Sequence, residues 1–600
     1  MSRLPALLAA ALIVLSACRH GPAEAPAHSG TEAARALAEL SEAYWDHEMR
    51  KAPVWATFLS DRRYDELLPD VSPPGIEAQR ARAKKLLDDT RALNDRQLDE
   101  ADRLTRDTLI SLLEAEVGLF VCEAHLWDVN AMDGVQTLLG ELPTLHGITD
   151  PEHAEALLVR YRKSGAFIDG HIANLRTGSS SGYTAAKVSV QRVLEQLDAM
   201  LKGPVEESPW VAEVQPKGWS DGRVRRLRAE LAKEAEAHVR PALERYRLFL
   251  RNEYLPEARV DVAVSANENG EACYRAKIRH STGLALSPEE LHKTGLEEAS
   301  RNAAEMRRLA KALTGRDDVP LSEVNGLLAQ DPARTARDRE GLVTFVAGLI
   351  SRAERVMPQA FGRLPKMKLE VKQIEAFRES SAAPGYYYAG SLAEERPALF
   401  YLNTSNLTER LLHMLEPLTF HEAVPGHHLQ GALAQELTGL PRFRRELGET
   451  AYVEGWAHYA ERLADELQLY SGDAGRFAMQ SDQALRAVRL VTDTGMHALG
   501  WSRERALAYM LEHTAEPRDQ AEREIDRYIV WPGQALAYKV GQLEILRLRG
   551  EAKKRLGDRF DLRAFHDEVL KRGALPLPIL RREVEAWIEK SAPAAASPDA

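Results

Sequence analysis

Cysteine is scarce in this 600-residue chain, which contains three. Cys18 belongs to an N-terminal segment with a role of its own, described below. Cys122 and Cys273 are therefore left as the two residues that could form a disulfide in an oxidising compartment. Two unrelated buried thiols are the alternative. The chain can hold at most one internal disulfide of this kind.

Clusters of basic residues and long apolar runs are also missing. The formal net charge is −11, and an acidic chain without basic clusters argues against nucleic acid as a partner. Beyond the N-terminus, no stretch approaches the ~18 consecutive apolar residues that a membrane-spanning helix needs. No Gly/Ser/Pro-rich linker divides the chain, so we expect residues 35–595 to form one large helical domain, with room for two lobes.

The first 17 residues have the pattern of a signal peptide. Arg3 precedes an apolar run from Leu7 to Leu15 that is too short to span a bilayer in the mature protein. The run leads into Ser16-Ala17-Cys18, which resembles the lipobox at which bacterial lipoproteins are cut and acylated. We therefore expect a lipid on Cys18, a flexible tether over residues 18–34, and a place in the cell envelope. Arg19, by resemblance to sorted lipoproteins, favours the outer membrane, facing the periplasm; an ordinary signal peptide with a chance cysteine is the alternative.

Helical periodicity dominates the rest of the chain. Apolar residues recur at three- and four-residue spacing over residues 76–119, 222–254, 288–314, 335–357, 427–438 and 446–469. Ser287-Pro288-Glu289-Glu290 has the form of a capping box at the start of one of these helices. Strand patterns are confined to Lys368–Ile374 and Ala398–Asn403. The predicted fold class is mainly α, a large helical body with a small sheet just before residue 421.

The run HEAVPGHH at residues 421–428 carries the strongest chemical signal. In the HExxH zinc motif two histidines four residues apart face one ion, and the glutamate points at its water. Here His427 and His428 follow His421 by six and seven residues. In a regular helix the sixth position would face roughly 120° away, and the seventh would lie ~10 Å further along the axis. Neither could share a zinc ion with His421 unless the helix breaks.

Pro425 and Gly426 provide that break. Proline cannot donate a hydrogen bond to the carbonyl of His421, and glycine tolerates dihedral angles closed to other residues. A local break could bring one of the two histidines back beside His421, and we slightly favour His428 over His427. A catalytic zinc usually has three protein ligands, and Glu454, on a following helix, is the best candidate for the third. We expect one Zn²⁺ per chain.

The chain resembles a bacterial family known as domain of unknown function 885, which is similar to the gluzincin metallopeptidases. The resemblance covers nearly all of the mature chain. Its marks are Ala56-Thr57, Arg63-Tyr64-Asp65, GETAYVEGWAHYAE at 448–461, Asp493-Thr494-Gly495-Met496-His497 and PGQALAYKVG at 532–541. The resemblance implies a helical fold with a zinc site. It implies peptidase activity less firmly, because most members of the family are uncharacterised.

If zinc binds, Glu422 is the expected general base of a peptide hydrolase. It would take a proton from a zinc-activated water and return it to the leaving amine. His497 and Tyr538 are the candidates for donating a hydrogen bond to the oxyanion; the alternative for each is an ordinary packed side chain. Arg527 and Lys539 are candidates for binding a substrate carboxylate, although such cations are usually solvated.

Two segments before the motif could contact a peptide substrate. Ala398–Asn403 could be an edge strand on which an extended peptide aligns, with Asn403 as a substrate contact, or an ordinary strand of the sheet. Tyr386-Tyr387-Tyr388 could line the pocket or form an aromatic core cluster.

Two other interpretations compete with the hydrolase. Residues 178–182 (GSSSG) match the G-x-S-x-G pattern of serine hydrolases but lack the preceding strand that a nucleophile elbow requires. They suit a mobile loop better. A lipoprotein that binds zinc or a peptide without turnover is the second interpretation, and the presence of Glu422 argues against it.

Overall fold

The structure is a computed structural model, and it describes residues 30–374, 379, 383–390, 392, 396–407 and 410–592. Within these residues the chain is mainly helical with one three-stranded sheet, which confirms the predicted fold class. Cys18 and the signal peptide lie outside the described residues. None of the described helices is both long enough and apolar enough to cross a membrane.

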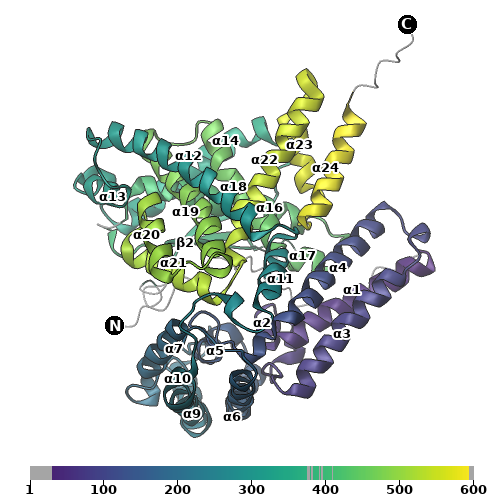
Figure 1. Cartoon of the computed structure of the whole chain (residues 1–600), viewed down its shortest axis with the longest axis vertical. Helices are drawn as coiled ribbons and strands as arrows, with labels where there is room; N and C mark the ends of the chain where they lie inside the picture. Colours follow the sequence, from purple (N-terminus) through teal and green to yellow (C-terminus); the bar gives the residue numbers. More distant parts are fainter. Residues whose placement is uncertain are drawn as a thin grey trace.

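The N-terminal third builds the lower part of the molecule in Figure 1. Helices α1 (Glu32–Lys51), α3 (Pro73–Ala92) and α4 (Glu100–Gly118) pack together on one side. Helices α5 (Val135–His146), α6 (Pro151–Ser180), α7 (Lys187–Met200), α8 (Asp221–Glu234) and α9 (Arg240–Phe249) form the neighbouring group. The two groups have separate apolar clusters, one around Trp45 and one around Trp210.

Two predictions in this part need correction, and the helical prediction for residues 222–254 is confirmed. Residues 76–119 form two helices, because Asn94 and Asp99 accept hydrogen bonds from nearby backbone amides and start new helical segments. Residues 222–254 are helical throughout but contain two π-helical stretches, at 235–239 and 250–254. Gly178 to Ser180 are the last turn of α6 rather than a mobile loop, and the Ser180 hydroxyl donates to the Thr177 carbonyl.

The C-terminal two thirds form the upper part of Figure 1. Helix α12 (Pro288–Thr314) lies along α19 (Asp473–Ala498), and α18 (Thr450–Glu466) lies along α22 (Ala537–Leu556). The capping box at the start of α12 is present as predicted. Helices α18 and α22 approach closely because Gly455 faces Gly541. A Cβ on Gly455 would lie 2.5 Å from the Gly541 backbone.

The sheet lies just before the zinc motif, as predicted. Its strands are β1 (Leu369–Gln373), β2 (Gly385–Tyr388) and β3 (Ala398–Leu402), in the order β1-β3-β2. Strand β3 is parallel to β1 and antiparallel to β2. The expectation that Ala398–Asn403 forms an edge strand is therefore wrong, because hydrogen bonds occupy both of its sides. The aromatic segment Tyr386–Tyr388 is the strand that lies at an edge.

The C-terminal body is joined to the N-terminal helices covalently as well as by packing. Cys122, just after α4, forms a disulfide with Cys273 of α11 (Gly270–Thr282), so of the two alternatives the disulfide is the one present. Both cysteines are buried in the largest apolar cluster, which continues through α14 (Arg339–Ala360), α18 and α22.

Candidate metal centre

The helix that carries the zinc motif is broken in its middle. Helix α15 (Leu415–Glu422) ends at Glu422, and α16 (His427–Gln435) begins at His427. Gly426 packs so closely against α15 that a Cβ there would lie 1.9 Å from the carbonyl oxygen of His421. The Pro425 carbonyl accepts a hydrogen bond of 3.0 Å from the Trp456 indole of α18, which fixes the connecting segment.

The break brings two imidazoles and one carboxylate together. Nε2 of His421 lies 3.5 Å from Oε2 of Glu454, and Nε2 of His427 lies 3.8 Å from the same oxygen. The two imidazole rings are perpendicular, with centroids 4.7 Å apart. All three side chains are buried, and their candidate ligand atoms lie within 4.8 Å of one another.

This donor set fits a zinc ion. In a tetrahedral site with bonds of about 2.0–2.2 Å, neighbouring ligand atoms are roughly 3.3–3.6 Å apart, close to the separations seen here. Oε2 of Glu454 is buried and has no hydrogen-bond partner. A buried carboxylate oxygen without a partner is costly, and a cation at this point would remove that cost.

Glu461 holds the first histidine in place. It lies seven residues after Glu454 on α18, so both side chains project from the same face of that helix toward α15. One Glu461 oxygen lies 2.7 Å from Nδ1 of His421, and the other lies 3.1 Å from Nδ1 of His458. A carboxylate on Nδ1 leaves Nε2 of His421 free for a metal and makes the imidazole more basic.

Charge and burial act differently on the two candidate histidine ligands. Burial tends to lower the pKa of His421, but its contacts with Glu454 and Glu461 outweigh this effect and raise it to about 10. Burial and the neighbouring His421 lower the pKa of His427 well below its usual value. His427 is therefore the neutral imidazole of the pair, and a metal would displace a proton from His421.

Glu422 lies beside this cluster, at the end of α15. Burial raises the pKa of its carboxyl to about 7. One of its oxygens accepts a 3.0 Å hydrogen bond from the backbone amide of Tyr387 in β2. Edge strand β2 thus holds the Glu422 carboxylate in place, and Glu422 is the residue that the sequence predicts to transfer the proton.

His428 is turned away from the cluster. Its Nε2 lies 3.2 Å from the carbonyl oxygen of Met367, and its ring packs on Tyr387 with centroids 5.7 Å apart. Burial lowers its pKa to about 4. The preference for His428 over His427 is therefore corrected. The chain re-enters the helix at His427, so the first residue of α16 faces α15 and the next one faces the sheet.

His497 does not supply an oxyanion donor in this structure. Its Nδ1 accepts a 3.0 Å hydrogen bond from the amide of Val264, and its Nε2 lies 2.9 Å from the carbonyl of Tyr528. The side chain is fully buried in the core. Both ring nitrogens are used by the backbone, so the alternative of a packed core histidine is the correct one.

Tyr538 remains close to the cluster. Burial and the nearby Glu454 raise its pKa to about 12. Its ring lies under the Arg489 guanidinium, whose central carbon is 4.7 Å from the ring centroid. Its hydroxyl makes no hydrogen bond within the described part of the chain, which leaves the group free to donate.

The three predicted substrate contacts are all engaged elsewhere. Lys539 is buried and bonds to Gln483 at 3.2 Å, Gln542 at 2.8 Å and Glu298 at 3.2 Å. Arg527 bonds to Gln534 and Glu524. Asn403 donates to the Glu379 carbonyl and accepts from the Ser405 amide. These side chains stabilise the interior, and the expectation that they bind substrate is corrected.

The sequence alone did not single out Glu461 or Arg486, and it marked Tyr387 only as part of an aromatic segment that could line the pocket. The i,i+7 spacing from Glu454 could have revealed Glu461. Arg486 of α19 pairs with Asp482 at 2.8 Å, and its charge opposes part of the rise that burial causes in the pKa of Glu422. No local signal marks Arg486, because its place depends on how α19 packs against α15.

Comparison with known proteins supports the resemblance to the bacterial family. A protein from Colwellia psychrerythraea has 27% sequence identity, covers 93% of this chain and all of its own, and has a TM-score of 0.86. A protein from Shewanella oneidensis has 18% identity, covers 91% of this chain and 99% of its own, and has a TM-score of 0.71, which shows a shared fold. Both structures are described as those of a “putative lipoprotein”, the second “of unknown function”. No curated protein matches the chain. The sequence profile of a bacterial family matches residues 53–584, and the chain therefore belongs to DUF885, the family described as “bacterial protein of unknown function”.

Proposed function

We propose that this protein is a zinc-dependent peptide hydrolase that acts outside the cytoplasm. The observation that carries the proposal is the convergence of His421, His427 and Glu454 on one buried point, with Glu422 next to it. Two imidazoles and a carboxylate are the ligand set of one of the catalytic zinc classes. The fold and the family are compatible with this chemistry but do not themselves identify a reaction.

Each side chain has a defined task in this proposal. His421, His427 and Glu454 hold the ion, which when bound would polarise the scissile carbonyl and acidify a water molecule. Glu422 accepts the proton of the attacking water and passes it to the leaving amine. Tyr538 donates its hydroxyl proton in a hydrogen bond to the oxyanion. Glu461 keeps Nε2 of His421 directed toward the ion.

An extended substrate would lie along strand β2. Its inner side pairs with β3, and the Tyr387 amide on its outer side points to Glu422. A peptide lying along that outer side would pass beside the base, and main-chain hydrogen bonds would hold it there. This role replaces the one first assigned to β3.

The proposed place of action follows from the N-terminus. Ser16-Ala17-Cys18 fits lipid attachment, and both related structures carry a lipoprotein description. A lipid on Cys18 would anchor the enzyme in the cell envelope, on the outer membrane facing the periplasm.

Peptide hydrolysis measured before and after removal of metal tests the proposal. The purified protein should cleave a mixture of unstructured peptides, lose activity with a chelator, and regain it when zinc is added back. Glu422→Gln should bind zinc but not cleave. A protein that binds zinc at one equivalent, yet cleaves no peptide in any of these states, would instead be the zinc-binding lipoprotein without turnover.

A further inference from the structure

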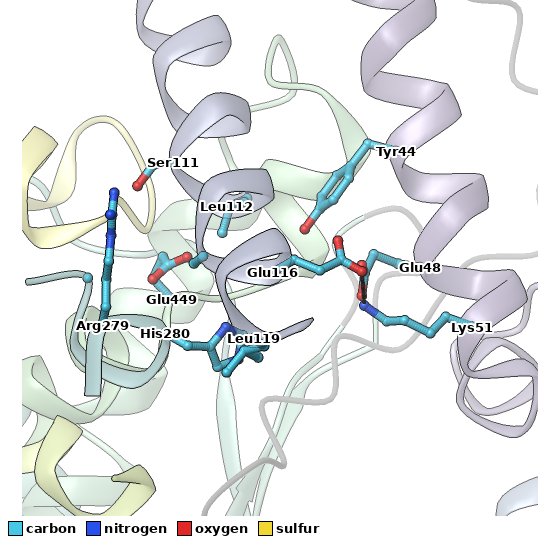
Figure 2. Close-up of a pocket in the computed structure, with 12 residues that line it drawn as sticks. Tyr44, Glu48, Lys51, Ser111, Leu112, Glu116, Leu119, Arg279, His280 and Glu449 are labelled. Atoms are coloured by element: carbon cyan, nitrogen blue, oxygen red, sulfur yellow. Dashed lines mark hydrogen bonds and ion pairs between the residues drawn. The ribbon is translucent and has the colours of Figure 1, made fainter. Parts of the chain in front are cut away.

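A cavity lies where the N-terminal helices meet the C-terminal body, away from the metal centre, and it has its own set of polar groups. It has a volume of about 220 Å³ and lies between α1, α4, α11 and the residue that precedes α18. Figure 2 shows the Tyr44 hydroxyl on the same side as Glu48 and Glu116, with Glu449 and His280 across from them. The metal-centre residues are not among those that line it.

Several polar groups that border this cavity have no partner within the described residues. Glu449 forms no hydrogen bond or ion pair within the described residues, although its carboxylate borders the cavity. One oxygen of Glu116 is buried and without a partner. The Tyr44 hydroxyl also has no hydrogen-bond partner among the described residues, and the side chain is 94% buried, since 6% of it is exposed. Groups this well buried are normally satisfied.

The carboxylate of Glu449 has no evident structural task. Glu449 is the N-cap residue of α18, and such residues usually stabilise the helix by accepting a hydrogen bond from a backbone amide with the side chain. Glu449 makes no such hydrogen bond. Burial raises the pKa of its carboxyl to about 7, which reflects the lack of a compensating cation.

The cations of the cavity are already paired. Nζ of Lys51 lies 2.6 Å from Glu48 and 3.0 Å from Glu116, and Arg279 bonds to Glu114 at 2.8 Å. The Lys51 ammonium also occupies the point between Glu48 and Glu116, where with His47 a metal ion could otherwise be held. An anion would have to break these pairs, whereas a cation would find free acceptors.

Apart from Ser111, the remaining side chains of the wall are apolar. Leu112, Ala115 and Leu119 line the cavity between the two polar sides. The volume is below the ~300–1,000 Å³ of sites for drug-sized ligands, so the occupant is a small molecule or a single side chain. Its ends must donate hydrogen bonds and its middle must be aliphatic.

We propose that this cavity is a binding site for a small organic cation, an ammonium or guanidinium group on a short aliphatic chain. Glu449 accepts from the cationic group at one end, the free oxygen of Glu116 and the Tyr44 hydroxyl accept from a donor at the other end, and the leucines cover the aliphatic part. The proposal does not depend on the zinc-hydrolase proposal, because the two sites share no residue. Glu449 is the N-cap residue of α18 and lies five residues before Glu454.

Calorimetric titration of the full-length mature protein with 1,4-diaminobutane tests this site. We expect saturable binding at one equivalent, and no binding of 1,4-butanediol, which has the same length and no charge. Glu449→Gln should weaken binding roughly 10- to 100-fold, the loss expected for a charged hydrogen bond. Tyr44→Phe should weaken it less. Glu42→Gln, on the exposed face of α1, is the matched control and should bind as the wild type does.

Three results would overturn the proposal. They are no saturable binding of the diamine by the wild type, equal binding of the diol, and unchanged affinity in both Glu449→Gln and Tyr44→Phe. Glu454→Gln separates this site from the metal centre, because it should retain the diamine affinity; loss of binding there would place the diamine at the metal centre. Tyr44→Phe carries the test if Glu449→Gln does not fold.

Discussion

Gly426→Ala perturbs the metal centre without touching a ligand. The new Cβ would lie 1.9 Å from the His421 carbonyl oxygen, 2.5 Å from the His421 carbonyl carbon and 2.5 Å from the Phe420 carbonyl oxygen. Cβ atoms essentially never approach other heavy atoms closer than 3.0 Å. The backbone of α15 and the start of α16 must therefore move apart by at least about 1.1 Å, because all three contacts are with backbone atoms and none is with a flexible side chain.

A shift of this size is large for a zinc site. Metal–ligand distances are held to about 0.2 Å, and His427 directly follows the substituted residue. We expect zinc affinity to fall by at least roughly tenfold, and the folded state to lose about 1–3 kcal/mol from overpacking. The glycine is needed here for close approach and not for an unusual φ, which is −80°.

Gly431→Ala is the matched control. It makes the same substitution in the same helix, but its Cβ would lie 3.6 Å from the Tyr387 ring, an ordinary contact. Alanine is also favoured over glycine inside a helix by about 0.5–1 kcal/mol. Zinc content after dialysis, competition with a chromophoric chelator, and thermal unfolding without metal should be measured for both variants. Wild-type zinc affinity in Gly426→Ala would refute the claim that the break builds the site.

Four further predictions follow from the same contacts. His427→Ala should lose most of the bound zinc while His428→Ala keeps it, as measured by atomic spectroscopy; the reverse result would restore His428 as the ligand. Glu461→Gln should lower zinc affinity by roughly 10- to 100-fold while leaving all three ligands in place, and an unchanged dissociation constant in chelator competition would remove its orienting role. Tyr538→Phe should lower kcat by about 10²–10³ with little change in zinc content, and an unchanged kcat would exclude the hydroxyl from the oxyanion site. Cys18→Ser should move the protein from the membrane to the soluble periplasmic fraction, and continued membrane binding would contradict lipid anchoring.

Some of this site was predictable from local sequence, because the cause is local. Pro425 and Gly426 interrupt a helix wherever they occur, so the break between His421 and His427 could be inferred from residue type. Glu454 could be predicted because it lies 26 residues after His428, on a following helix that can return its carboxylate to the first helix. The sequence could not decide whether His427 or His428 is the ligand, since this depends on the direction in which the chain re-enters the helix.

The incorrect assignments concern residues whose partners are distant in the chain. His497 bonds to Val264, which is 233 residues away, and Lys539 bonds to Gln483. Nothing near His497 or Lys539 in the sequence indicates that these distant partners satisfy their hydrogen-bonding groups. The sequence does not reveal strand β2, because β2 is four residues long and aromatic and lacks the alternation typical of a strand, so it could not show that β3 is paired on both sides. The helical body itself was predictable, because periodicity reports directly on which faces are buried.

Zinc-edge anomalous diffraction from crystals of the metal-loaded protein tests the central claim most directly. The account predicts a single strong peak about 2.0–2.2 Å from Nε2 of His421, Nε2 of His427 and a carboxylate oxygen of Glu454. A peak coordinated by His428, a peak between His47 and Glu116, or no peak after saturation with zinc would contradict it.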